Sequence, residues 1–254
     1  MTTLPGEPCW IELFTPDTDA AADFYGGLFG WTATEPDEEL GGYRIFERDG
    51  VPVAGLMRND GSMGGPSTWT VYLASTDATA LLDRARAAGA EVIAGPMQVG
   101  DLGTMGVLVD PAGAAVGVWQ AQSFPGTGVR AQDGAPAWFE TLTKDYDAAV
   151  RFYADVFGWD THTMSDTPEF RYTTLGTDEQ ARAGIMDATA MLGEDPSRWQ
   201  FYLQVADTDA TVERAEAGGA TVVVPAEDTP YGRLAVLRDP AGVQFCLMGP
   251  TPQG

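Results

Sequence analysis

Two glutamates, Glu12 and Glu140, stand inside short apolar stretches that are suited to buried strands. A carboxylate in such a place is costly to bury unless a hydrogen-bond donor or a cation pairs with it. One interpretation is chemical, because each carboxylate is a candidate general base or a partner for a cationic ligand. The other is an internal ion pair, for which Arg44 and Arg171 stand in matching later strands. The sequence leaves both interpretations open.

Each glutamate belongs to one copy of a duplicated stretch. Residues 10–31 read WIELFTPDTDAAADFYGGLFGW, residues 138–159 read WFETLTKDYDAAVRFYADVFGW, and 12 of these 22 positions are identical without a gap. Such self-similarity indicates an internal duplication. Because one ancestral module explains both copies, the presence of the acid in both does not decide what it does.

The duplicated stretch predicts a strand, a turn and a helix. Residues 11–15 and 139–143 predict the strand, and the aspartates that follow are suited to capping the free amides of a first helical turn. Apolar side chains then recur at helical spacing. Gly30 and Gly158 stand where a helix commonly ends in a left-handed residue.

The same order, a strand, a helix and three strands, recurs four times along the chain. In the first half we expect strands at 11–15, 31–34, 43–47, 51–57, 68–74, 91–96, 103–109 and 115–120, with a second helix at 78–88. The second half repeats this order, and a DPAG turn precedes the last strand of each half. We therefore predict a first domain at 1–121 with modules at about 9–58 and 68–120, a linker at 122–136, and a second domain at 137–254 with modules at about 138–187 and 198–249.

The composition excludes several classes of partner. A net charge of −23 would repel phosphate backbones and anionic membrane surfaces, so we expect neither nucleic-acid nor membrane binding. No long apolar run and no basic leader are present, and a cytoplasmic protein is the expectation. Cys9 and Cys246 form neither a disulfide framework nor a metal-binding pair by spacing.

The paired modules, the FYxxxFGW end of the first helix and the DPxG turn resemble the vicinal oxygen chelate superfamily, which includes glyoxalase I, bleomycin-resistance proteins and extradiol dioxygenases. The resemblance covers nearly the whole chain. It implies an α+β fold of paired βαβββ modules. The two glyoxalase-like domains would each be an eight-stranded curled sheet that forms a cup, with helices on the outside.

Enzymes of this superfamily usually hold a divalent metal through His, Gln or Glu on the first, fifth and eighth strands, and sometimes on the fourth. The matching positions are Trp10, Gly55, Thr70 and Gly117 in the first domain and Trp138, Gly184, Gln200 and Cys246 in the second. A divalent ion needs several oxygen or imidazole donors held together. The single histidine, His162, does not supply them. We therefore expect no metal and no other cofactor in either cup.

Side chains two apart on a strand share a face, so the resemblance and the alternation together predict the lining of each cup. Glu12 and Glu140 are the candidate catalytic residues. The candidate ligand-binding residues are Trp10, Phe14, Met57, Thr70, Tyr72 and Trp119 in the first cup and Trp138, Met186, Gln200, Tyr202 and Met248 in the second. Apolar walls with a few polar groups are typical of small-molecule sites. Alternatively, Trp10 and Trp138 plug the vacant metal sites.

Three functions are compatible with this pattern. The first is a metal-independent protein of the glyoxalase/bleomycin-resistance type that holds an apolar, aromatic or cationic small molecule in one or both cups, as a monomer or a homodimer. The second is a metal-free lyase, isomerase or modifying enzyme with Glu12 or Glu140 as its base. The third, a divalent-metal glyoxalase or dioxygenase, needs ligands that the sequence lacks.

Overall fold

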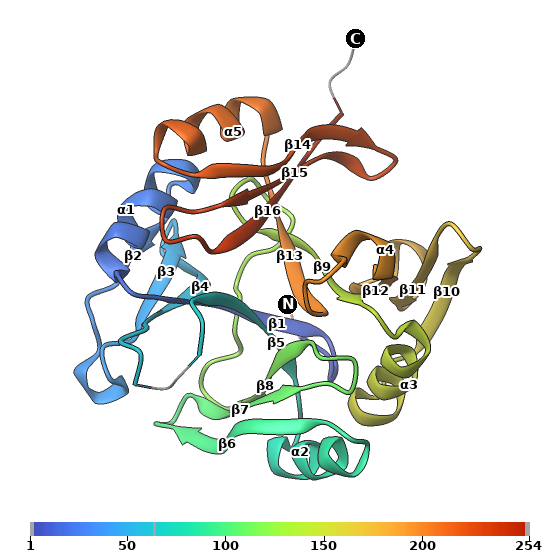
Figure 1. Cartoon of the computed structure of the whole chain (residues 1–254). Coiled ribbons are helices and arrows are strands. Elements are labelled where there is room, and N and C mark those ends of the chain that lie inside the picture. Colours follow the sequence, from blue (N-terminus) through green and yellow to red (C-terminus); the bar gives the residue numbers. More distant parts are fainter. Residues whose placement is uncertain (1–2, 63–64, 252–254) are drawn as a thin grey trace. The chain divides into compact units, whose positions relative to one another are not determined.

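The computed structural model describes residues 3–62 and 65–251, and it contains two eight-stranded sheets with few helices (Figure 1). The first sheet has the strand order β2-β3-β4-β1-β5-β8-β7-β6, and the second repeats it as β10-β11-β12-β9-β13-β16-β15-β14. Both sheets are mixed: β1 runs parallel to β4 and β5 parallel to β8, whereas the hairpin neighbours are antiparallel. The predicted α+β class and the two eight-stranded sheets are confirmed.

The first half of the chain contains β1 (Pro8–Thr15), α1 (Thr18–Phe29), β2 (Thr32–Ala33), a 3-10 turn (Glu38–Leu40), β3 (Arg44–Arg48), β4 (Val51–Arg58), β5 (Thr68–Ala74), α2 (Ala78–Ala87), β6 (Glu91–Val99), β7 (Gly103–Val109) and β8 (Ala115–Ala121). The second half contains β9 (Pro136–Thr143), α3 (Tyr146–Phe157), β10 (Thr161–Asp166), β11 (Arg171–Leu175), a 3-10 turn (Asp178–Gln180), β12 (Ala183–Asp187), α4 (Thr189–Leu192), β13 (Arg198–Gln204), α5 (Thr208–Ala217), β14 (Thr221–Thr229), β15 (Gly232–Arg238) and β16 (Gln244–Gly249).

The chain also divides into two compact units, and each is assembled from segments that are far apart in the sequence. One unit comprises residues 1–9, 70–126 and 139–200, so α2 lies with α3. The other comprises residues 10–69, 127–138 and 201–254, so α1 lies with α5 (Figure 1). Each unit therefore combines one module of the first half with one module of the second. The domain boundaries 1–121 and 137–254 stay a prediction.

Most strands lie where the sequence predicts them, and the differences fall at element ends. The bounds of β5 and β7 match the expectation to the residue, whereas β6 continues to Val99 instead of stopping at Pro96. The strand β2 has only two residues, because Trp31 before it is buried in the core beside Tyr25. The four-residue α4 was not predicted; Ala188 at its N-cap makes no side-chain cap bond, and the Asp187 carboxylate accepts from the Thr189 amide at 3.2 Å. Within the described ranges, no helix is long and apolar enough to cross a membrane.

The two long helices of the duplicated stretch begin and end as predicted. Asp17 accepts hydrogen bonds from the amides of Asp19 and Ala20, and Asp145 accepts one from Ala148. These carboxylates satisfy amides that have no partner within the helix. At the other end of α1, Gly30 has a φ of 69°. A residue without a Cβ is favoured in this left-handed conformation.

A buried tyrosine fastens each of these helices to a DPAG turn. The Tyr153 hydroxyl donates to the carboxylate of Asp110 at 2.8 Å and accepts from the indole of Trp199 at 2.7 Å. In the other unit, the Tyr25 hydroxyl donates to Asp239 at 3.0 Å and accepts from Trp69 at 3.1 Å. The indoles of Trp69 and Trp199 therefore lie on the helix side of their sheets.

The left-handed end of α1 is tested by a pair of glycines on the same helix. Gly30→Ala should lower the free energy of unfolding by about 1 kcal/mol, because alanine disfavours a positive φ. Gly27→Ala, inside the helix with open space around its Cβ position, should raise it by about 0.5–1 kcal/mol. Urea denaturation monitored by circular dichroism gives both values. If both variants changed the free energy of unfolding in the same direction, the left-handed conformation assigned to Gly30 would be contradicted.

The buried Tyr153–Asp110 bond makes a prediction that depends on pH. Burial raises the pKa of the Asp110 carboxyl above its ordinary value of 3.8, and the hydrogen bonds from Tyr153 and backbone amides oppose that rise. A carboxyl whose folded pKa is raised favours the folded state most when it is protonated. Its contribution to stability is therefore largest below pH 3.8, declines as the pH rises to the raised folded value, and is constant above it.

Tyr153→Phe removes a donor that stabilises the charged carboxylate. It should cost about 1–3 kcal/mol at pH 7 and measurably less at a pH where Asp110 is protonated. Guanidinium denaturation at a series of pH values measures the difference. Tyr231→Phe, at an exposed tyrosine, is the control and should change little at any pH. A cost for Tyr153→Phe that does not vary with pH would overturn the argument.

Candidate functional site

Strands β9 and β12 place Glu140 in the second sheet. The two strands run parallel, with Glu140 opposite Gly184 and Leu142 opposite Met186. Glu140 is only 6% exposed, although its side chain ends in a polar carboxyl group. Its neighbours along the strand, Phe139 and Thr141, project to the other face because side chains alternate. A carboxylate is thus held within the sheet beside a residue that has no side chain.

Two donors hold this carboxylate. The Tyr172 hydroxyl donates to Oε2 of Glu140 at 2.8 Å, and the Gln200 amide donates to Oε1 at 2.9 Å. Tyr172 comes from β11 and is buried, with its ring stacked on Phe170 at a centroid distance of 5.5 Å. Donors to a carboxylate form stronger bonds than neutral pairs do, so they fix its position. We call Glu140, Tyr172 and Gln200 the Glu140 cluster.

Apolar side chains flank the Glu140 cluster on the same strands. Leu142 packs with Ala188 and Leu192, and the half-buried Met186 packs against them. Leu192 belongs to α4, so this short helix covers the strand positions two residues beyond Glu140 and Gly184. The cluster is therefore a small polar group beside an apolar wall, which is the usual composition of a small-molecule site.

The first copy has the same register and a different filling. Glu12 lies opposite Gly55, and Phe14 lies opposite Met57. The indole nitrogen of Trp10 donates to the Tyr43 hydroxyl at 2.9 Å, and a Cβ on Gly55 would collide with both atoms. Trp10 is 5% exposed. These two aromatic side chains thus fill the space in front of Gly55, as expected if Trp10 acts as a plug.

Tyr43 and Tyr172 were not predicted as site residues from the sequence. A Cβ on Gly184 would collide with the Tyr172 hydroxyl, just as one on Gly55 would collide with that of Tyr43. The tyrosine therefore occupies the space that the missing side chain leaves. A signal was present in the sequence, because a glycine within one apolar strand stands close to a tyrosine in the preceding one. It was not decisive, since the register between the two strands was unknown.

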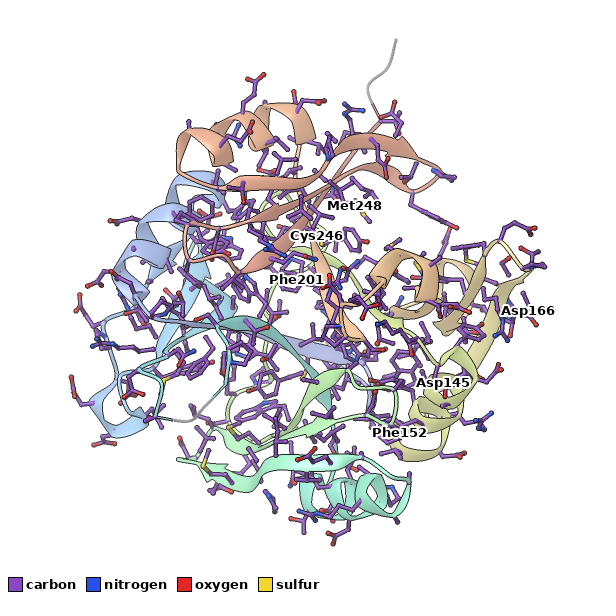
Figure 2. The ribbon with its side chains drawn as sticks, viewed as in Figure 1. Asp145, Phe152, Asp166, Phe201, Cys246 and Met248 are labelled. Atoms are coloured by element: carbon purple, nitrogen blue, oxygen red, sulfur yellow. The ribbon has the colours of Figure 1, made fainter. Side chains whose placement is uncertain are left out.

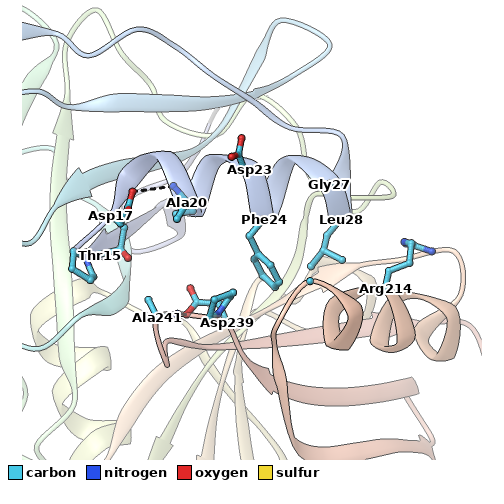
Figure 3. Close-up of a pocket in the computed structure, with 14 residues that line it drawn as sticks. Thr15, Asp17, Ala20, Asp23, Phe24, Gly27, Leu28, Arg214, Asp239 and Ala241 are labelled. Atoms are coloured by element: carbon cyan, nitrogen blue, oxygen red, sulfur yellow. Dashed lines mark hydrogen bonds between the residues drawn. The ribbon is translucent and has the colours of Figure 1, made fainter.

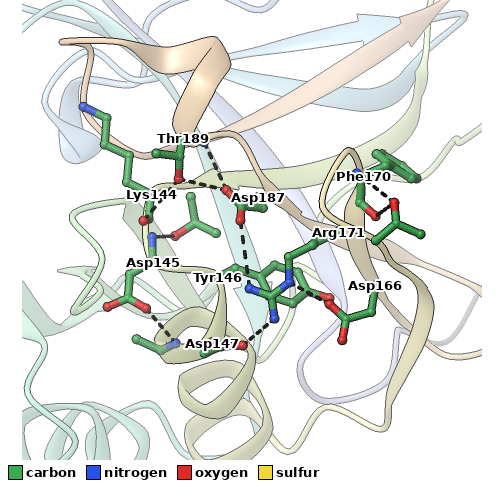
Figure 4. Close-up of polar contacts among 12 residues, drawn as sticks. Lys144, Asp145, Tyr146, Asp147, Asp166, Phe170, Arg171, Asp187 and Thr189 are labelled. Carbon is green, nitrogen blue, oxygen red and sulfur yellow. Dashed lines mark hydrogen bonds and ion pairs between the residues drawn. The ribbon is translucent and has the colours of Figure 1, made fainter.

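The proposed ion pair between the glutamates and the arginines of the third strands is wrong. Arg171 donates to Asp147 at 2.8 Å and to Asp166 at 2.7 Å, and its guanidinium lies 4.2 Å from the centroid of the Tyr146 ring (Figure 4). These hydrogen bonds raise its already high pKa. Arg44 pairs with Asp19 at 2.8 Å. Both arginines are used at the first turn of a helix, because an aspartate there projects toward the neighbouring strand.

The remaining predicted ligand-binding residues lie on the expected strands. Tyr72 is buried opposite Gly117, Tyr202 is buried opposite Cys246, and Thr70 is half-buried on β5. Cys246 and Met248 lie on β16 (Figure 2).

Two tryptophans differ in how they are held. Trp119 donates its indole N–H to the Phe124 carbonyl at 2.9 Å, and its ring lies where a Cβ on Gly103 would be. It is thus fixed within its own unit. Trp138 is half-buried. Whether these residues contact a ligand stays a prediction.

The residues present do not fit the divalent metal that the resemblance implies. In the second sheet, the fourth-strand position is Gly184, and the Tyr172 hydroxyl fills the space beside it. The Gln200 amide presents a donor N–H, not an oxygen, to Glu140. Among the described residues, no group of three or more His, Cys, Asp or Glu side chains is gathered closely enough to hold an ion. A hard cation needs several oxygen or nitrogen donors, and a single carboxylate does not provide them.

Two family models match the chain. The model described as glyoxalase/bleomycin resistance protein/dioxygenase superfamily matches residues 9–118. The model described as glyoxalase-like domain matches residues 138–248. Together the two matches cover both halves of the duplication.

Curated relatives match the chain over nearly its full length. It is 38% identical over 273 aligned positions to the anthracycline biosynthesis protein DnrV of Streptomyces peucetius, with 96% of this chain and 93% of that protein covered. It is 36% identical over 253 positions to the putative glyoxylase CFP32 of Mycobacterium bovis, with 98% and 96% covered.

Solved structures share the fold at low sequence identity. The 2,3-dioxygenase LapB of Pseudomonas sp. KL28 has a TM-score of 0.66 and 10% identity, with 100% of this chain and 95% of that chain covered. The Mn(II)-bound glyoxalase of Novosphingobium aromaticivorans has a TM-score of 0.64 and 16% identity, with 96% and 82% covered. At such identity the likeness concerns the fold alone.

The two tyrosines that fill the glycine positions should differ in what they contribute. Tyr172→Phe removes a donor from a buried carboxylate and should cost about 1.5–3 kcal/mol in the free energy of unfolding. Tyr43→Phe removes a neutral partner of the Trp10 indole and should cost about 0.5–1.5 kcal/mol. Urea denaturation of the two matched variants measures both. A larger cost for Tyr43→Phe would contradict the view that the Tyr172–Glu140 hydrogen bond is the stronger of the two.

Proposed function

The chain belongs to the glyoxalase/bleomycin resistance protein/dioxygenase superfamily, and on that premise we propose that it is a metal-independent protein that binds a small aromatic or cationic molecule. The observation that carries the proposal is the Glu140 cluster, a buried carboxylate held by Tyr172 and Gln200 beside the apolar side chains of Leu142 and Met186. Fold alone does not decide between functions within this superfamily, because function depends on the site.

The Glu140 cluster favours ligands that donate hydrogen bonds. A carboxylate only accepts hydrogen bonds. Tyr172 and Gln200 are oriented by donating to it. A hydroxyl or ammonium group on a ligand would therefore be attracted to the cluster, while its apolar body packs against residues such as Met186. Charge-assisted hydrogen bonds of this kind are stronger than neutral ones.

Independence from metals is supported by the donor set. A glycine and a tyrosine occupy the fourth-strand and neighbouring positions in both copies, and the only histidine, His162, is exposed on β10. The cluster is thus suited to hydrogen bonding with a ligand, and it lacks the several donors that a metal ion needs. No step of this proposal requires a bound ion.

The names of the relatives suggest the chemical class of the ligand. DnrV and its counterpart DauV are described as anthracycline biosynthesis proteins. Anthracyclines are hydroxylated polycyclic aromatic compounds, so they combine a large apolar surface with hydrogen-bond donors. We take such a compound as the ligand class for the second domain. The first copy is the weaker candidate, because Trp10 and Tyr43 fill its corresponding space.

A metal-free enzyme is the second candidate function. The observation that favours it is the Tyr172–Glu140 hydrogen bond at 2.8 Å, which places a phenol donor beside a candidate base. A carboxylate placed in this way is able to act as a general base toward an acidic proton of a bound substrate. Glu140 would be the base in the second domain, and Glu12 is its counterpart in the first.

Fluorescence titration with an anthracycline and with its sugar-free aglycone tests the binding proposal. Wild-type protein should bind saturably. Glu140→Gln should weaken binding roughly tenfold to hundredfold, because it removes the charge from a hydrogen bond worth about 1.5–3 kcal/mol. Glu91→Gln, at an exposed glutamate of the same unit, is the control and should leave the affinity unchanged. Tighter binding of the anthracycline than of the aglycone would identify the amino sugar as the contact.

Native mass spectrometry with Zn²⁺, Mn²⁺ or Fe²⁺ added completes the test. Metal independence requires that none of these ions binds stoichiometrically and that strong chelation leaves ligand binding unchanged. Glu12→Gln should weaken ligand binding less than Glu140→Gln does. Equal effects of the two variants would contradict the proposal that the ligand binds in the second domain. Chemical conversion of the ligand by wild-type protein, lost in Glu140→Gln, would instead support the enzyme.

A further inference from the structure

A groove of about 700 Å³ runs along α1 in the unit that also contains α5. Phe24 and Leu28 point from α1 toward the DPAG turn that carries Asp239 and Ala241 (Figure 3). Thr15 and Pro16 line it near the first turn of α1, and Arg214 of α5 lines it near the last. The groove uses none of the residues of the Glu140 cluster.

The duplication provides an internal comparison for the groove. At the place on α3 that matches Gly27, the chain has Asp155. The arginine that matches Arg214 is Arg84, which donates to the carbonyl oxygen of Val156 on α3 at 3.2 Å. Arg214 instead donates to Thr211 on its own helix at 3.0 Å. The groove on α1 is therefore open at two places. At one, Gly27 has no side chain, and at the other, Arg214 bonds to its own helix.

The acidic side chains near the first turns of α1 favour a cation, whereas Arg214 lines the groove near the last turn. Asp17 and Asp23 line it on α1, and both side chains are exposed. Asp23 makes no ion pair with any residue in the described part of the chain, whereas α3 has Arg151 at the matching place. Its carboxylate is thus available to an ammonium group. Asp23 lies on the outer side of α1, and Phe24 and Leu28 project from the inner side toward the DPAG turn (Figure 3).

Thr15 supplies an independent observation. It lines the groove, its residue is fully buried, and its hydroxyl has no hydrogen-bond partner. In the matching position on the other unit, the Thr143 hydroxyl accepts from the amide of Asp145 at 3.1 Å. A buried hydroxyl without a partner is costly. It gains a partner if a molecule with an N–H group occupies this end of the groove.

We propose that the α1 groove is a second binding site, for a small organic amine with an aromatic or aliphatic body. The body packs on Phe24 and Leu28. The ammonium group lies at the acidic rim near Asp17 and Asp23. This site goes beyond the function proposed for the Glu140 cluster and does not depend on it.

Isothermal titration with three molecules of one shape tests the charge preference. The probes are 1-naphthylmethylamine, 1-naphthylmethanol and 1-naphthoate. The amine should bind tightest and the carboxylate weakest. Asp23→Asn should reduce the advantage of the amine over the alcohol by about threefold, as expected for a partly exposed ion pair.

Filling the groove tests its location. Nothing lies within 4 Å of a Cβ placed on Gly27, which lines the groove, so Gly27→Leu adds a bulky side chain there without a clash at its Cβ. This variant should lose amine binding and keep anthracycline binding. Asp155→Leu, the matched change on α3, should keep both. Amide chemical shifts of Ala20, Gly27 and Ala241 should move with the amine in wild-type protein.

Threonine variants test the unpartnered hydroxyl. Thr15→Val should raise the melting temperature of the free protein and weaken amine binding severalfold, whereas Thr143→Val should lower the melting temperature and leave binding unchanged. Failure of the amine to bind saturably, or binding that persists in Gly27→Leu with the same amide shifts, would overturn the proposal. Loss of anthracycline binding in Glu140→Gln with intact amine binding would leave it standing, so the two sites are tested separately.

Discussion

The hydrogen bond between a helix tyrosine and the aspartate of a distant DPAG turn is the interaction on which each compact unit depends. The Tyr25 hydroxyl reaches Asp239 across 214 positions of sequence, and that of Tyr153 reaches Asp110 across 43. In both cases, backbone amides of the turn hold the other carboxylate oxygen. Since all these groups are buried, each must be satisfied within the unit. The bond therefore links the helix of one module to the last hairpin of another and keeps both in place.

A second constraint lies within the sheets, where the residue opposite each glutamate must be small. Gly55 and Gly184 leave a space that a tyrosine from the adjacent strand enters. Where the tyrosine meets Glu140, the result is a charged cluster with two donors. In the first copy, the hydroxyl of the matching Tyr43 accepts from the Trp10 indole. The glutamate, the glycine opposite it and the tyrosine from the adjacent strand are the same in both copies, whereas the fifth-strand residue is Thr70 in the first and Gln200 in the second.

The same asymmetry occurs on the helices. The first-copy helix carries Gly27 and Asp23 where the second carries Asp155 and Arg151. These exchanges alter volume and charge at exposed positions, while Phe24 and Phe152 keep the buried side of each helix apolar. A duplicated fold can therefore retain its core and change its surfaces independently. The α1 groove and the Glu140 cluster are products of such changes in different modules.

Local patterns in the sequence determined the elements of this protein. Apolar alternation, the Asp17 and Asp145 caps and the left-handed Gly30 and Gly158 act through neighbouring residues, so their outcome is readable from the chain alone. The repeat of these patterns also indicated the modules and the superfamily.

Only the tertiary structure decided the partners of the charged and polar side chains. Arg171 could have met Glu140 or an aspartate, and the strand register together with the first turn of α3 directed it to Asp147. Tyr172 could not be assigned to Glu140 until the space beside Gly184 was known. Module pairing, too, depends on long-range bonds such as Tyr25–Asp239. Periodicity describes which face a side chain occupies, but the partner on that face is set by packing between segments that are remote in the sequence.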